Sequence, residues 1–127
     1  MAAKAAAVEP QEKPEPKDPL APVASGVFED GAFKGLRWQD HKVFGVVFRL
    51  REYTTGEEDE AWDAAENPDG ETVNERIRRR FLLSTSIVSP VVTADDVTAW
   101  PSLKTRMLLV VMDRLNGLPP ADAEGNA

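Results

Sequence analysis

The sequence predicts a small α+β protein, mainly helical, in which an N-terminal β-hairpin packs on a small bundle of three to four helices between disordered tails. Three observations predict this fold class. Apolar and polar residues alternate over 42–53, which is the period of a half-buried strand. From Thr54 onward, capping residues precede segments in which apolar residues recur at helical spacing. Prolines and charged residues dominate the first 26 residues, where neither a helix nor a central strand can persist.

Two tails flank the predicted domain. Residues 1–26 are expected to form a disordered tail rich in proline, alanine and charge, and residues 119–127 a short flexible one. Before Leu20 there is almost no large apolar side chain, so burial cannot offset the entropy lost on ordering. Residues 27–118 are therefore predicted to form a single α+β domain.

The predicted hairpin pairs a short alternating run, 33–38, with the run 42–53, and the polar residues 39–41 form its turn. Phe44 and Phe48 lie on one face of the second strand. An isolated two-stranded hairpin is marginally stable in water. The face that carries these two phenylalanines must therefore pack on helices or on another chain.

The first helix is predicted to begin at Thr54 or Thr55, because each is followed three residues later by a glutamate, Glu57 or Glu58, that can complete a capping box. It runs to about Glu66, where the turn-forming residues 67–70 end it. A second helix is expected from about Glu71. Its predicted buried stripe consists of three apolar residues at a spacing of four, namely Val73, Ile77 and Phe81.

Two more helices follow. The hydroxyl of Thr93 can cap a short helix that ends near Trp100, because Pro101 disfavours the α conformation in the residue before it. Ser102 begins the last helix, and the Asn-Gly pair at 116–117 closes it.

Composition excludes several classes of function. The 15 lysines and arginines against 22 aspartates and glutamates give a net charge of −7, there is no cysteine, and His41 is the single histidine. Disulfide scaffolds, thiolate metal sites and thiol catalysis require cysteine. Neither a serine nucleophile elbow nor a glycine-rich phosphate loop occurs. We therefore expect no enzyme, no cofactor and no metal site.

Charged clusters leave alternatives open. The acidic run 57–60 and the pair Asp95 and Asp96 are interpreted as helix N-termini, since consecutive helical residues do not converge on one ligand. The basic cluster 76–80 is either a charged helix face with intramolecular partners, a contact for an acidic partner surface, or a nucleic-acid contact. A net charge of −7 makes nucleic-acid binding the least favoured of these.

The last helix carries the most informative apolar feature, six consecutive apolar residues over 107–112. Either this helix is central, or part of it meets another chain, such as a second copy or a client; the sequence does not decide between interior and interface. Methionine suits an adaptable contact surface. The residues predicted to bind a partner are Leu108, Leu109, Met112 and Leu115, with Phe44 and Phe48 as a second possibility.

Four stretches carry a family resemblance. They are Arg-Leu-Arg-Glu-Tyr-Thr-Thr-Gly-Glu-Glu at 49–58, Arg-Arg-Phe-Leu-Leu-Ser-Thr-Ser-Ile-Val at 79–88, Val-Thr-Ala-Asp-Asp-Val at 92–97 and Met-Asp-Arg-Leu-Asn-Gly-Leu at 112–118. Together, over about residues 42–118, they resemble the tail assembly chaperones of long-tailed, siphovirus-type bacteriophages. Relatives often have an Asp-Gly turn between the arginine helix and the Thr-Asp-Asp helix, whereas this chain has Ser89-Pro90.

The resemblance implies a non-enzymatic role in the host cell cytoplasm. Such chaperones bind the tape measure protein, keep it soluble and help recruit tail tube subunits. Two other functions stay open: a small structural tail completion or connector protein of the virion, and a small nucleic-acid-binding regulator. No membrane segment is expected, because the longest apolar run is far shorter than a bilayer requires.

Overall fold

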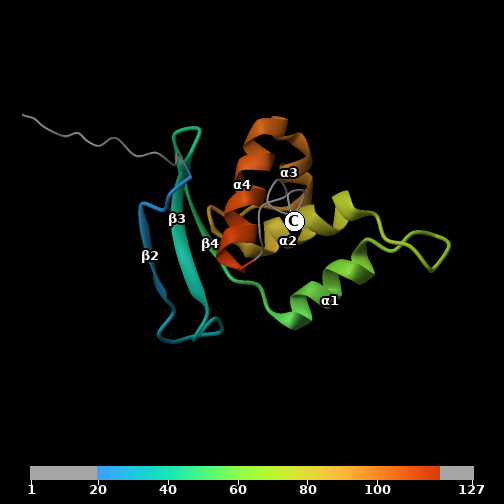
Figure 1. Ribbon diagram of the computed structural model, residues 1–127, viewed down its shortest axis with the longest axis horizontal. Helices are drawn as coiled ribbons and strands as arrows, with labels where there is room; N and C mark the ends of the chain where they lie inside the picture. The colour runs from blue at the N-terminus through green and yellow to red at the C-terminus, as the bar shows by residue number, and fades with distance from the viewer. Residues whose placement is uncertain (1–19, 118–127) are drawn as a thin grey trace, which may run out of the picture.

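The computed structural model describes residues 20–117. The predicted tail at 119–127 and most of the predicted tail at 1–26 lie outside the described residues. In chain order the elements are β2 (Ala24–Val27), β3 (Arg37–Val43), β4 (Val46–Arg51), α1 (Thr55–Ala64), α2 (Glu75–Ser86), β5 (Ile87–Ser89), α3 (Ala94–Ala99) and α4 (Ser102–Leu115). Figure 1 shows these helices on one side of the sheet, with α1 and the loop that follows it farthest from the strands.

The described strands form one antiparallel sheet in the order β2-β3-β4-β5. The α+β class is confirmed, but the sheet has two strands more than the predicted hairpin. β5 is only three residues long, too short for an alternation pattern to reveal it. β2 spans Ala24–Val27, so the first described strand begins three residues before the predicted domain start at 27.

The hairpin between β3 and β4 turns at a different place from the predicted one. Residues 39–41 belong to β3, and the turn is formed by Phe44 and Gly45, with φ angles of 52° and 79°. Two consecutive positive φ angles are typical of the two-residue turn whose twist matches that of the strands. Phe44 is a poor turn residue by composition, which is why the alternation of 42–53 pointed to one uninterrupted strand.

Glycine at position 26 allows β2 to lie under an aromatic ring. A Cβ added to Gly26 would stand 2.8 Å from the indole of Trp38, the residue paired with it across the sheet. A side chain at this position would force the indole to shift, so the close approach of β2 to Trp38 uses the absence of a side chain at Gly26.

The predicted caps of three helices are present, and at α1 the capping residue is Thr54 rather than Thr55. Thr54 accepts from the N–H of Glu57, whose carboxylate accepts from the N–H of Thr54. Thr93 and Asp96 form the same reciprocal pair at the start of α3. Gly117 ends α4 with a φ of 78°.

The start of α2 was predicted wrongly, and its buried stripe was predicted correctly only in part. Asn74 caps the helix, because Asp69 first accepts N–H bonds from Glu71 and Thr72 and so prolongs the turn. Of the predicted stripe, Val73 precedes the helix and Phe81 packs against the core. Ile77 is 45% exposed, whereas Leu82 and Leu83 are buried.

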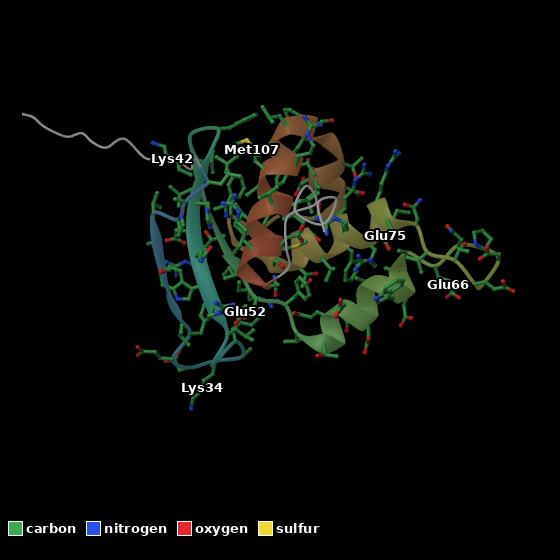
Figure 2. All side chains as sticks on the ribbon, in the orientation of Figure 1. Lys34, Lys42, Glu52, Glu66, Glu75 and Met107 are labelled. Carbon is green, nitrogen blue, oxygen red and sulfur yellow. The ribbon has the colours of Figure 1, made fainter. Side chains whose placement is uncertain are left out.

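The core lies between the sheet and α4. Phe48 and Leu50 of β4 meet residues of the helices there, chiefly Leu82, Leu83, Val97, Leu108, Val111, Met112 and Leu115. α4 contacts β3, β4 and α2, so it is the central helix of the described residues. Met107, at the margin of this core, is labelled in Figure 2 on the side of α4 toward the β3–β4 turn.

Candidate partner-binding site

The structure places most of the predicted partner-binding residues in the interior. Leu108 and Met112 are 0% exposed, Leu115 is 1% exposed and Phe48 is 2% exposed. The prediction that these four residues form a partner surface is therefore corrected, because they are core residues of the folded chain. The physical reason is that α4 has the sheet on one side and α2 on the other, so burial within the fold accounts for an apolar arc that covers most of its circumference.

The other two predicted residues are accessible. Phe44 is 52% exposed at the tip of the β3–β4 turn. Leu109 is half-buried and lines a groove between α2, α3 and α4. The structure does not bring these two residues together with the other four at one surface.

A first groove, here called the apolar groove, lies between the start of β4, the segment after β5 and the α3–α4 corner. It has a volume of about 390 Å³ and includes Val46, Val91, Val92, Ala99, Trp100 and Lys104 in its lining. Val91 is 88% exposed and Val46 is 42% exposed. These two exposed valines give the hollow an apolar margin that is accessible to a partner.

The lining of the apolar groove includes two aromatic side chains that contact each other. The ring of Phe48 meets that of Trp100 edge to face, with centroids 5.8 Å apart. The ammonium of Lys104 lies 4.3 Å from the Trp100 ring centroid, which is within the range of a cation–π contact. These aromatic side chains are therefore held in place, while the valines at the margin of the groove remain exposed.

A second groove, here called the arginine groove, lies between α2 and the α3–α4 corner. It has a volume of about 310 Å³, and its walls include Arg76, Arg79 and Arg80 from α2 and Arg106 from α4. Leu109 and Trp100 also line it, so Trp100 stands between the two grooves. The sequence indicated the cluster on α2 but not Arg106, which only the packing of α4 against α2 brings near.

The arginines of α2 differ in their partners. Arg78 pairs with Glu75 at 2.8 Å, and Arg79 pairs with Asp113 of α4 at 2.8 Å. These two residues confirm the interpretation of a charged helix face with intramolecular partners. Within the described residues, no ion pair holds Arg76 or Arg80.

The predicted acidic clusters serve local structure. Glu57 completes the cap of α1 and accepts from Arg51 at 2.7 Å; the hydrogen bond from Arg51 holds the pKa of Glu57 below its ordinary value. Asp96 completes the cap of α3. Within residues 20–117, no group of three or more histidine, aspartate or glutamate side chains is arranged to hold a metal ion.

His41 lies in β3 rather than in a turn, and it is 2% exposed. Its Nε2 is 2.9 Å from the amide oxygen of Gln39.

No helix in the described part of the chain is long and apolar enough to cross a membrane. Comparison of the chain with protein-family models, curated proteins and solved structures found no match.

Proposed function

We propose that the protein is a non-enzymatic tail assembly chaperone of a long-tailed bacteriophage, which binds the tape measure protein in the host cytoplasm and supports assembly of the tail tube. The observation that carries this proposal is the apolar groove with its two exposed valines, Val46 and Val91. In this proposal the β-hairpin packs on the bundle of helices, and the groove lies where the two meet. The resemblance of residues 42–118 supplies the identity of the client.

The shape of the apolar groove suits one apolar face of a helical client. Its volume of about 390 Å³ is that of a small-ligand pocket and admits a few side chains. An amphipathic helix that lays its apolar stripe into such a groove is a common mode of peptide recognition. Asp96 and Lys104 also line the groove and offer one charge of each sign to the polar margin of a client. The net charge of −7 favours solubility of the complex.

The test is coexpression with the tape measure protein encoded in the same phage genome. Val91→Asp places a charge in the apolar groove, and Val23→Asp, at a residue that is 63% exposed and precedes β2, is the matched control. We expect the wild type and Val23→Asp to keep the client soluble. We expect Val91→Asp to lower the soluble fraction about tenfold, since a buried unpaired carboxylate opposes binding.

Two outcomes would contradict this proposal. A client that stays insoluble with the wild-type chain would exclude the chaperone function. A client equally soluble with both variants would exclude the apolar groove as its docking site. Thermal melting of both variants shows whether each remains folded.

Composition of the mature particle separates the chaperone from a structural tail completion or connector protein. A chaperone leaves the finished tail, so mass spectrometry of purified virions should find the chain far below the amount of the tail tube subunit. A fixed stoichiometric amount in the virion would support the structural function instead.

A further inference from the structure

The arginine groove is positively charged, although the chain as a whole carries a net charge of −7. Arg76 and Arg80 are one helical turn apart on α2 and therefore lie on the same side of the helix. Arg106 reaches the same groove from α4. Within residues 20–117, no ion pair neutralises any of these three guanidinium groups.

The immediate surroundings do not cancel this charge. Glu75 also lines the groove, but its carboxylate is held by Arg78 at 2.8 Å. Asp113 of α4 is occupied by Arg79, which donates to both of its carboxylate oxygens. Glu75 and Asp113 therefore already have basic partners, and the charges of Arg76, Arg80 and Arg106 remain for a ligand.

The lining between the arginines is apolar. Leu109 and Trp100 are half-buried there, and Val97 is 2% exposed beneath them. A bare anion would leave this apolar surface in contact with water. A ligand that places a leucine-sized side chain on Leu109 and Trp100, with carboxylates on either side, satisfies the apolar surface and the guanidinium groups together.

We propose that the arginine groove binds an acidic peptide segment of a partner protein, with the carboxylates of the segment on Arg76, Arg80 and Arg106 and an apolar side chain on Leu109 and Trp100. Guanidinium groups bind carboxylates through paired N–H donors, which gives such contacts both strength and direction. The proposal concerns a different groove from the one assigned to the tape measure protein, and it does not rest on that assignment.

Nucleic acid is the less suitable ligand. Single-stranded nucleic acid binds through bases stacked on aromatic rings along an extended basic channel. The groove contains one aromatic ring, that of Trp100, and Lys104 lies 4.3 Å from its centroid. A long polyanion would also extend beyond the groove, over a chain whose overall net charge is −7.

The binding experiment uses the full chain and a fluorescein-labelled heptapeptide, Gly-Asp-Glu-Leu-Glu-Asp-Gly, measured by fluorescence anisotropy. Two further probes are the same peptide with serine in place of leucine and a labelled hexathymidylate. We expect the leucine peptide to bind more tightly than either of them. Its addition should also shift the side-chain Nε–Hε signals of Arg76, Arg80 and Arg106 in an NMR spectrum.

Matched charge reversals locate the site. The double variant Arg76→Glu with Arg80→Glu removes the charges of the α2 wall. The double variant Lys34→Glu with Lys42→Glu makes the same change in net charge at exposed residues on the sheet side, which Figure 2 shows well away from Glu75 of the groove. We expect about a tenfold loss of peptide affinity for the arginine pair and less than about a twofold loss for the lysine pair.

Four results would contradict all or part of the acidic-peptide proposal. Equal loss in the two double variants would show general electrostatic attraction, and tighter binding of hexathymidylate would show a nucleic-acid site. Equal affinity for the serine peptide would remove the apolar contact from the proposal, and no peptide binding by the wild type at millimolar concentration would overturn it. The neutral pair Arg76→Gln with Arg80→Gln repeats the test should the charge reversal unfold the chain.

Discussion

The two arginine-rich regions of the molecule use the same side chain in opposite ways. On the face of the sheet that points away from the core, Arg49 lies 3.7 Å from the centroid of Trp38 and pairs with Asp40 at 2.8 Å. Arg51, on the same face, lies 4.0 Å from the centroid of Phe33 and pairs with Glu57 at 2.7 Å. Each of these guanidinium groups therefore has an aromatic ring and a carboxylate within the fold.

The arginine groove shows the contrary arrangement. In the described part of the chain, Arg76, Arg80 and Arg106 line a concave surface without an ion pair. The comparison indicates that the sheet arginines stabilise the fold, whereas the groove arginines are available to a ligand. Substitutions in the two regions should therefore differ in their effect on the free energy of unfolding.

The largest effect is expected for Glu57→Gln. Arg51 is 4% exposed, and without its carboxylate partner it would carry a buried, uncompensated charge. Breaking a buried ion pair from one side costs about 3 kcal/mol of the free energy of unfolding. Glutamine can still serve in the capping box. The loss of stability therefore measures the contribution of the ion pair and not that of the cap. Urea denaturation at neutral pH measures it.

The neighbouring change Glu58→Gln is the control for Glu57→Gln, and it should cost less than about 0.5 kcal/mol. Equal losses for the two variants would mean that acidic charge at the start of α1, rather than the Arg51 pair, carries the stability. In that case the sheet arginine would not differ from those of the groove.

Acid should abolish the difference between the wild type and Glu57→Gln. The hydrogen bond from Arg51 holds the pKa of Glu57 below its ordinary value of 4.5 in the folded chain. The carboxylate therefore adds its full stability above pH 4.5 and loses it as the pH falls through the lower, folded-state pKa. Denaturation curves recorded across this range should converge; a gap that persists at acid pH would point to packing instead of charge.

A smaller effect is expected for Arg49→Gln. The side chain of Arg49 is 38% exposed, so solvent screens its pair with Asp40, and the stacking on Trp38 is a partly exposed cation–π contact. Together these contacts contribute about 1 kcal/mol. Lys42→Gln, an exposed position in β3, is the control and should change the free energy of unfolding by less than about 0.5 kcal/mol.

Much of the helical part of the fold was predictable because its signals are local. The caps at Thr54 and Thr93 and the closing glycine at 117 each depend on residues within four positions. The sheet was less predictable because pairing depends on distant residues. β5 pairs with β4 through two Cα partners only, and the close approach of β2 to Trp38 uses the absence of a side chain at Gly26.

The candidate site was harder to predict than the fold. Six consecutive apolar residues in α4 are compatible with a central helix and with an interface, and only the contacts of α4 with the sheet and α2 show that Leu108 and Met112 are enclosed. The grooves come from residues far apart in the chain. Val46 and Val91 line one of them, and Arg80 and Arg106 line the other. No pattern along the sequence indicates that either pair shares a groove.

The smallest effect on stability is expected for Arg76→Gln combined with Arg80→Gln. Neither residue has an ion pair within residues 20–117, and glutamine and arginine have similar helix propensities. Two like charges at a spacing of four also repel each other on a helix, so their removal offsets any packing lost from the aliphatic stems. The free energy of unfolding should therefore change by less than about 0.5 kcal/mol, and added salt should reduce whatever change remains. A loss greater than about 1 kcal/mol would mean that these arginines stabilise the fold as those of the sheet do, and the distinction between the two regions would then fail.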